Sequence, residues 1–230
     1  KVTLSKYPHR EIITLDKNNN EVRYLPASTV CLGTGWHLEN NELSDIEILY
    51  VGQAYADGKR TAFERLKSHS TLQKILAQAQ YESPDYEIQI LTFEYCPYRV
   101  ISQMDGRAEN VISDYRDMDR FRSIMDNHLS TYEQICLIEA GLIRYFQPRY
   151  NAIYKDNFPS DKHKILESCY NLDFSGLIVE INSEELRFRL FSPTVKARGH
   201  HICQIDLLDP EKRWGFFHYG RGDGTFFKSP

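Results

Sequence analysis

The sequence lacks a long apolar run, closely spaced cysteines and an excess of positive charge. No apolar run approaches the roughly 18 to 20 residues that a membrane-spanning helix needs, so we expect no contact with a membrane. The first residues, KVTLSKYPHR, contain no apolar stretch like that of a signal peptide. The five cysteines lie far apart and form no CxxC pair, which predicts neither a structural zinc site nor a disulfide framework. Together these absences favour a cytoplasmic protein.

The absence of excess positive charge limits how the chain could bind nucleic acid. The formal net charge is −4 across 230 residues, whereas a protein that grips nucleic acid over a wide face is usually basic. Hydrophobic residues make up 41% of the chain, which is typical of a folded globular protein. Binding to DNA would therefore depend on a local cluster of cations and a limited number of phosphate contacts.

Strand patterns occur at several places in the amino-terminal half of the chain. The runs EIITL and EVRYL flank an Asn-rich turn at residues 17–20, which predicts an amino-terminal β-hairpin. Residues 46–51 form an apolar strand pattern that we expect to return beside a strand within residues 29–38. Residues 86–95 alternate between apolar and polar side chains, which predicts a third strand.

Helical spacing marks three further segments. Apolar residues recur at helical spacing in residues 59–68 and 72–79, and a charged segment contains a helical pattern at residues 117–125. A longer helix is expected to begin at Ser130, because Ser130 and Glu133 have the spacing of a capping box. Pro148 ends that helix. Its predicted buried stripe consists of Ile135, Ile138, Leu142 and Phe146.

These patterns predict the α+β class, with a small antiparallel sheet flanked by helices and a carboxy-terminal β-rich domain. We expect a hairpin extension at residues 1–24, a core at residues 25–155 with an insertion near residues 99–128, and a β-rich domain at residues 160–230. Three β-like runs, at residues 176–181, 186–191 and 201–207, support that last domain. Arg187 and Arg189 alternate in one of the runs, which predicts that both lie on one face and favours a phosphate-binding surface there.

The stretch IEILYVGQAYADGKRTAFERLKSH, at residues 46–69, carries the first candidate functional residues. A strand ends in Tyr50-Val51-Gly52, and a short amphipathic helix follows a Gly-Lys turn. Arg65 and His69 are four residues apart, so we expect both side chains to leave one face of that helix. A tyrosine, an arginine and a histidine in one groove could act on a phosphodiester.

The second group lies in STYEQICLIEAGLIRYFQPRYN, at residues 130–151. Glu139 lies beside the apolar stripe of the predicted helix, and Asn151 follows the helix end. With Tyr-Val-Gly, Arg65 and His69, these residues resemble the GIY-YIG nuclease family. Tyr50-Val51-Gly52 takes the place of Tyr-Ile-Gly, Glu139 that of the metal-binding glutamate, and Asn151 that of the asparagine beyond the helix.

The chain departs from the family pattern at the first motif, because Gly-Ile-Tyr has no clean copy upstream of Tyr50. The residues LPASTVC, at positions 25–31, resemble the usual leader to that motif and would put Cys31 at the first tyrosine position. Gly35-Trp36-His37 is the alternative and would put His37 there. Both alignments stay open on the sequence alone.

The resemblance implies a metal-dependent hydrolysis of DNA. Glu139 would bind Mg²⁺ or Mn²⁺, Arg65 would contact the scissile phosphate, and Tyr50 would lie near the attacking water. His69 would either accept a proton or orient the tyrosine, and Asn151 would fix the local geometry through hydrogen bonds. One carboxylate can suffice, because Mg²⁺ keeps several waters and takes substrate phosphate oxygens as ligands.

We therefore expect a Mg²⁺-dependent DNA endonuclease, of the restriction type or with a role in phage defence. A homodimer would let such an enzyme cut both strands of a duplex. One rival hypothesis is a non-catalytic nucleic-acid-binding module on the same fold, which the departure at the first motif favours. The other is a repair nuclease that recognises the structure of DNA rather than its sequence.

Overall fold

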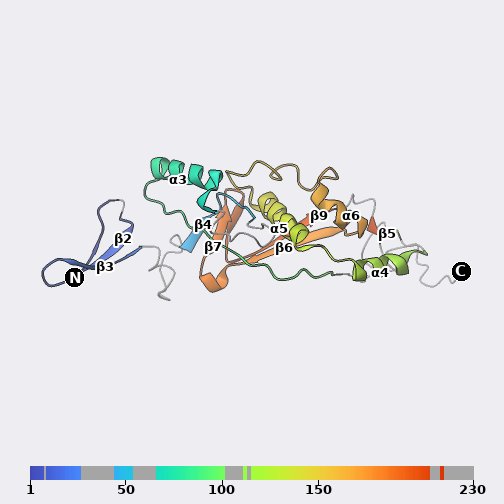
Figure 1. Cartoon of the computed structure of the whole chain (residues 1–230), viewed down its shortest axis with the longest axis horizontal. Coiled ribbons are helices and arrows are strands. Elements are labelled where there is room, and N and C mark those ends of the chain that lie inside the picture. Colours follow the sequence, from blue (N-terminus) through green and yellow to red (C-terminus); the bar gives the residue numbers. More distant parts are fainter. Residues whose placement is uncertain are drawn as a thin grey trace.

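The computed structural model describes residues 1–7, 9–26, 44–53, 66–101, 111–112, 115–207 and 213–214. In this part of the chain four α-helices combine with small β-sheets, so the predicted α+β class is confirmed. Figure 1 shows an elongated molecule, with the amino-terminal strands at one end and α4 (Asp117–Asp126) near the other. None of the described helices is long and apolar enough to cross a membrane.

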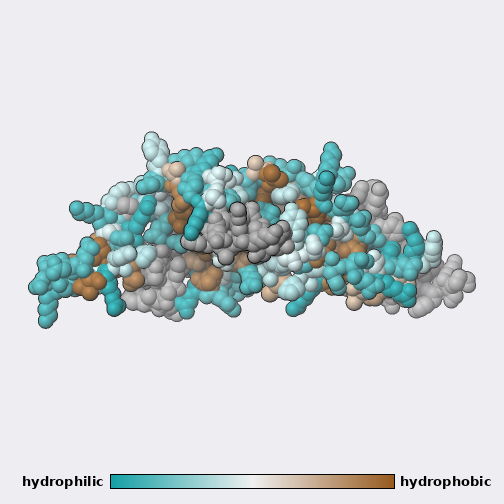
Figure 2. Space-filling model, viewed as in Figure 1, coloured by the Kyte–Doolittle hydropathy of each residue, from teal (hydrophilic) through white to brown (hydrophobic). Residues whose placement is uncertain are grey.

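The amino-terminal sheet contains three antiparallel strands, in the order β1 (Val2–Leu4), β2 (Glu11–Leu15) and β3 (Glu21–Pro26). The predicted hairpin is therefore confirmed, and β1 adds a strand that the sequence did not predict. None of its residues is buried, and apolar side chains lie exposed on this sheet (Figure 2). Arg10 attaches the sheet to the body through hydrogen bonds of 2.5 and 3.2 Å to the Pro84 carbonyl.

Helix α3 (Ser70–Glu82) confirms the helical pattern predicted at residues 72–79. Ile75 is the residue that it buries. The other helix pattern, at residues 59–68, falls largely outside the described residues.

The strand expected at residues 86–95 is wrong, because these residues form no strand in the structure. Their alternating pattern meets no strand partner within the described residues, and Ile90 and Phe93 stay about half exposed, at 51% and 47%. Alternation alone therefore did not create a strand here, because a strand also needs a neighbour to accept its backbone hydrogen bonds.

Helices α4 and α5 (Thr131–Phe146) confirm two predicted helices. Ser130 accepts a hydrogen bond from the Glu133 backbone N–H, and Glu133 accepts one from the Ser130 backbone N–H at 2.8 Å. This is the predicted capping box. Gln147 adopts the left-handed conformation at the end of α5, and Pro148 follows it.

The buried face of α5 is wider than the predicted stripe and is rotated from it. Phe146 is fully buried, but Ile135, Ile138 and Leu142 are only partly buried. The positions buried instead are Cys136, Leu137, Ala140, Gly141 and Ile143. The small Ala140 and Gly141 belong to this face because other elements approach α5 closely there.

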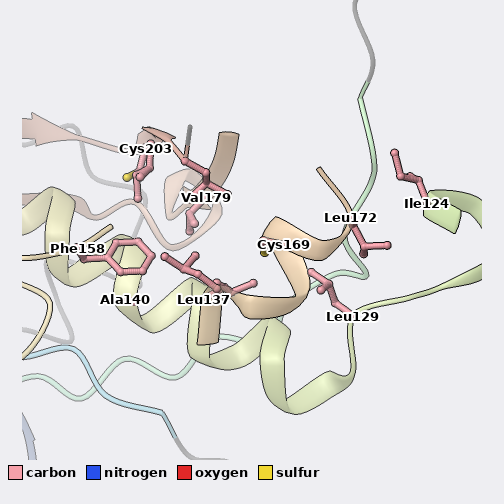
Figure 3. Close-up of a cluster of buried hydrophobic side chains, with 12 residues drawn as sticks. Ile124, Leu129, Leu137, Ala140, Phe158, Cys169, Leu172, Val179 and Cys203 are labelled. Carbon is pink, nitrogen blue, oxygen red and sulfur yellow. The ribbon is translucent and has the colours of Figure 1, made fainter. Parts of the chain in front are cut away.

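One hydrophobic core joins α5 to a two-stranded antiparallel sheet, β6 (Gly176–Asn182) and β9 (His200–Asp206). Figure 3 shows Leu137 and Ala140 of α5 pointing toward the side chains of the neighbouring elements. The short elements η2 (Lys164–Leu166) and α6 (Glu167–Asn171) contribute to the same core. Residues on both sides of position 160 therefore share this core, while the division into domains stays a prediction.

Strand β4 (Asp45–Glu47) pairs in parallel with β7 (Arg189–Ser192), which pairs in turn with β8 (Val195–Arg198). Arg189 binds Asp45 through two hydrogen bonds of 2.6 and 2.7 Å. Arg187 lies outside the strand, after η3 (Glu184–Leu186), with φ 58°. The prediction that both arginines share one strand face is therefore wrong, and Arg189 links two strands instead.

A last pairing lies near the far end of the molecule. The two-residue strands β5 (Val111–Ile112) and β10 (Arg213–Trp214) pair in parallel.

Candidate functional site

The candidate site is assembled on the five residues Leu49–Gln53, which follow β4 and which we call the site segment. The Ile48 backbone N–H bonds to the Phe191 carbonyl at 2.8 Å, so Ile48, the residue directly before the site segment, is anchored to β7. Further hydrogen bonds join the segment to other parts of the chain. They involve three of the residues singled out in the sequence.

Asn151 holds the middle of the site segment. Its Oδ1 accepts a hydrogen bond from the Val51 N–H at 2.9 Å, and its Nδ2 donates one to the Val51 carbonyl at 2.8 Å. The neighbouring Tyr150 N–H donates to the Leu49 carbonyl at 3.0 Å. A side-chain amide thus satisfies both backbone groups of Val51, in the manner of a neighbouring strand.

Glu139 holds the end of the same segment. Helix α5 presents it on a partly buried face, and its Oε1 accepts a hydrogen bond from the Gln53 N–H at 3.2 Å. The Gln53 side chain also contacts α5, because its Oε1 lies 3.6 Å from the Cys136 Sγ. Cys136 and Glu139 are three residues apart and therefore lie on one side of the helix.

Tyr50 extends from the segment toward α3. Its hydroxyl lies 3.5 Å from the His69 Nε2, a long hydrogen bond, and the two ring centroids are 5.3 Å apart at an angle of 61°. His69 immediately precedes α3 and acts as its N-cap: its Nδ1 accepts a hydrogen bond from the Leu72 N–H at 3.3 Å.

The cap fixes the proton position on neutral His69. A backbone N–H can only donate, so Nδ1 must be unprotonated to accept from Leu72. The ring proton is then on Nε2, which faces the Tyr50 hydroxyl. In this tautomer His69 donates to the tyrosine oxygen, which fits an orienting group rather than a proton acceptor.

Gly52 leaves the space that the Tyr50 ring occupies. A β-carbon at position 52 would lie 2.6 Å from the Tyr50 Cε1 and 3.0 Å from its hydroxyl oxygen. The ring therefore folds back over the glycine two residues later in the chain. Any larger residue there would displace the ring from its position beside His69.

Glu139 also affects the ionisation of two tyrosines, Tyr132 and Tyr154. Partial burial, followed by the charges of Glu139 and Cys136, raises the pKa of Tyr154. A hydrogen bond with Cys136 is the main cause that raises the pKa of Tyr132, and Glu139 adds to it. Both hydroxyls therefore keep their protons at neutral pH and can donate hydrogen bonds.

The donor set around Glu139 fits a hard cation held by few protein ligands. The described residues contain no group of three or more histidine, cysteine, aspartate or glutamate side chains that could hold a metal ion. A cation bound beside the site segment would take Glu139 as a carboxylate ligand, together with water and substrate oxygens. This suits Mg²⁺ or Mn²⁺, which accept carboxylate, water and phosphate oxygens together, and not a closed zinc site.

The structure brings together four of the five residues singled out in the sequence: Tyr50, His69, Glu139 and Asn151. Arg65 lies outside the described residues, as do both candidates for the first tyrosine position, Cys31 and His37. Four residues near the site were not predicted from the sequence: Gln53, Cys136, Tyr132 and Tyr154. Helical spacing could have indicated two of these, since Tyr132, Cys136 and Glu139 recur at intervals of four and three residues.

Comparisons with known proteins add no assignment, because no protein-family model, no curated protein and no solved structure matches this chain.

Proposed function

We propose that this chain is a metal-dependent endonuclease of the GIY-YIG type that hydrolyses DNA phosphodiester bonds. The observation that carries the proposal is the site segment itself. Through it, Tyr50 with His69, Glu139 and Asn151 meet at one place although up to 100 residues separate them in the chain. Chance surface positions would have no reason to converge on five consecutive residues.

In this proposal Tyr50 acts on the attacking water. A phenol of ordinary pKa, about 10, is a weak base at neutral pH and needs help to carry negative charge. The His69 Nε2–H points at its oxygen and would stabilise that charge through a hydrogen bond. Asn151 and Gly52 have positioning roles. Asn151 fixes the backbone next to Tyr50, and Gly52 leaves the space that the Tyr50 ring occupies.

Glu139 would hold the divalent ion, which when bound supplies positive charge to the developing phosphorane and the departing alkoxide. The Gln53 N–H keeps the carboxylate oriented toward the site segment. Tyr132 and Tyr154 remain protonated near this carboxylate and would offer hydrogen bonds to phosphate oxygens or to bound water.

The test is cleavage of plasmid DNA by the purified chain with Mg²⁺, with EDTA, and after Glu139→Gln. Glutamine keeps an oxygen that can accept from the Gln53 N–H, so the substitution removes the charge and little else. We expect cleavage that needs the metal and that falls about 10³-fold in the variant, the order seen when one transition-state contact is lost.

The cleavage products separate the versions of the proposal. Discrete fragments would support a restriction-type enzyme, whereas preference for branched or single-stranded DNA would support a repair nuclease. If the wild type cuts none of these substrates but retards DNA in a gel, the catalytic proposal fails and a binding module replaces it. Sedimentation of the active protein would show whether it works as the proposed homodimer.

A further inference from the structure

We propose that Lys74 and Arg149, which lie over the ring of Tyr150, form a clamp for the DNA backbone beside the candidate site. The proposal rests on the function proposed above and names the contacts by which DNA is held. It starts from the net charge of −4, which requires that any DNA contact come from a local group of cations.

The clamp joins two elements that lie far apart in sequence. The Lys74 Nζ of α3 lies 5.9 Å from the Tyr150 ring centroid, and the Arg149 Cζ lies 5.5 Å from it. Both distances are within the range of cation–π attraction, about 6 Å. One aromatic ring therefore attracts two cationic side chains that come from different elements.

The clamp is attached directly to the site segment. The Tyr150 N–H bonds to the Leu49 carbonyl at 3.0 Å, and the next residue, Asn151, bonds twice to Val51. Lys74 is four residues beyond the first residue of α3, the helix whose cap residue, His69, contacts Tyr50. We therefore expect a DNA strand bound at Tyr50 to present another of its phosphates to the clamp.

The surrounding charge fits an anionic partner. The segments that carry the clamp, residues 66–82 and 147–155, contain the cations Lys67, Lys74, Arg149 and Lys155 and the acidic residue Glu82, and Asp85 and Asp156 lie just beyond their ends. Glu82 pairs with Arg149 at 3.3 Å, but both side chains are largely exposed, at 45% and 60%. An exposed pair of this kind contributes little, so a phosphate can compete for the arginine.

The test compares the salt dependence of DNA binding in wild type and in Lys74→Gln/Arg149→Gln. Binding to a labelled duplex is measured in EDTA, so that no cleavage occurs. Each phosphate contact contributes about 0.9 to the slope of log Kd against log salt, so the slope should fall by about 1.8. The ratio of the Kd of the variant to that of the wild type should therefore be about 12-fold smaller at about 200 mM salt than at about 50 mM salt.

The matched control is Arg122→Gln/Lys196→Gln, which removes the same charge from exposed positions on α4 and β8. It should leave the slope near that of the wild type. Equal slopes for the clamp variant and the wild type would overturn the clamp, and so would an equal fall in the control. A duplex of RNA that competes better than DNA would overturn the choice of partner.

Cleavage by the wild type separates this proposal from the proposed function. If the wild type cuts DNA and the clamp variant binds with an unchanged slope, the clamp is wrong and the nuclease stands. If the wild type does not cut but the slope falls in the clamp variant alone, the clamp stands and the nuclease is wrong. If the wild type neither binds nor cuts DNA, both fail.

Discussion

The core around α5 and the site segment are held together by different forces. In the core, the side chains of Leu137 and Ala140 are at most 2% exposed and belong to one cluster of buried apolar side chains. The site segment, in contrast, is only partly buried, and hydrogen bonds from Asn151 and Glu139 take the place of a neighbouring strand. Apolar burial accounts for most of the stability of a fold, whereas directed hydrogen bonds fix geometry.

This contrast explains why the site can be precise without adding much to stability. A glutamate and a tyrosine at a candidate site must remain accessible to substrate, so they cannot be buried as core residues are. Their positions are instead determined by groups with strict geometry: an amide, a helix cap and a glycine. Changes in the core should therefore alter stability first, and changes at the site segment should alter activity out of proportion to stability.

The largest change in stability is expected from Phe146→Ala. Phe146 is fully buried, and its ring centroid lies 4.8 and 4.9 Å from those of Tyr145 and His201. Removing it should lower the free energy of unfolding by about 3–5 kcal/mol. Chemical denaturation would measure this loss. Phe93→Ala is the control, because Phe93 is 47% exposed, and an equal loss there would contradict the assigned core.

Asn151→Leu should have a smaller effect on stability and a large effect on cleavage. Leucine has a similar volume but leaves the Val51 N–H and carbonyl without their amide partner. The free energy of unfolding should fall by about 1–3 kcal/mol. Cleavage by the folded variant should fall about 10²-fold, because the amide holds Val51 and Tyr50 directly precedes Val51. The exposed Asn157→Leu is the control and should change neither quantity.

Acid should weaken the core through His201. His201 is buried; its Nε2 faces the Leu190 and Arg198 carbonyls at 2.9 and 3.0 Å, and its Nδ1 lies 3.2 Å from the Tyr145 hydroxyl. Burial is the main cause that lowers its pKa below the ordinary 6.5. The unfolded chain then takes up the proton at a higher pH than the folded chain does.

The contribution of His201 to stability is therefore complete above pH 6.5 and is lost as the pH falls from there toward the folded-state pKa. Denaturation curves measured across this range should show the loss. In His201→Gln the same range should show a weaker dependence on pH. An unchanged pH dependence in that variant would assign the effect to other groups.

Gly52→Ala should have the smallest effect on stability. The atoms nearest to the new methyl group belong to the end of the Tyr50 side chain, which can rotate away, so the free energy of unfolding should change by less than about 0.5 kcal/mol. Cleavage should still fall about 10²-fold because the ring leaves its place beside His69. Equal cleavage rates for variant and wild type would show that the position of Tyr50 is unimportant.

The sequence predicted the features that depend on neighbouring residues. Ser130 and Glu133 form the expected capping box, and the apolar spacing at residues 72–79 gave α3, because both patterns act within a turn or two of helix. The parallel pairing of β4 with β7 joins residues 144 positions apart, as the Asp45–Arg189 pair shows. No local pattern in either segment indicates such a partner.

The candidate site shows the same difference between features that a local pattern predicts and contacts that only the fold creates. The order of Tyr50, His69, Glu139 and Asn151 could be recognised from a family resemblance, but the hydrogen bonds that bring them to one segment could not. Cys136 and Tyr132 escaped notice because a cysteine and a tyrosine on an amphipathic helix are ordinary packing residues. Only the folded chain places Cys136 against Gln53 and so beside Glu139.

The most direct test is single-turnover cleavage by Tyr50→Phe, Glu139→Gln and the double variant. If Tyr50 and Glu139 serve one reaction, each single change should slow cleavage strongly, and the double variant should be little slower than the slower single variant. Cleavage at the wild-type rate by either single variant, folded as the wild type, would contradict a shared role of Tyr50 and Glu139. That result would remove the residue from the site and leave the site segment without a catalytic role.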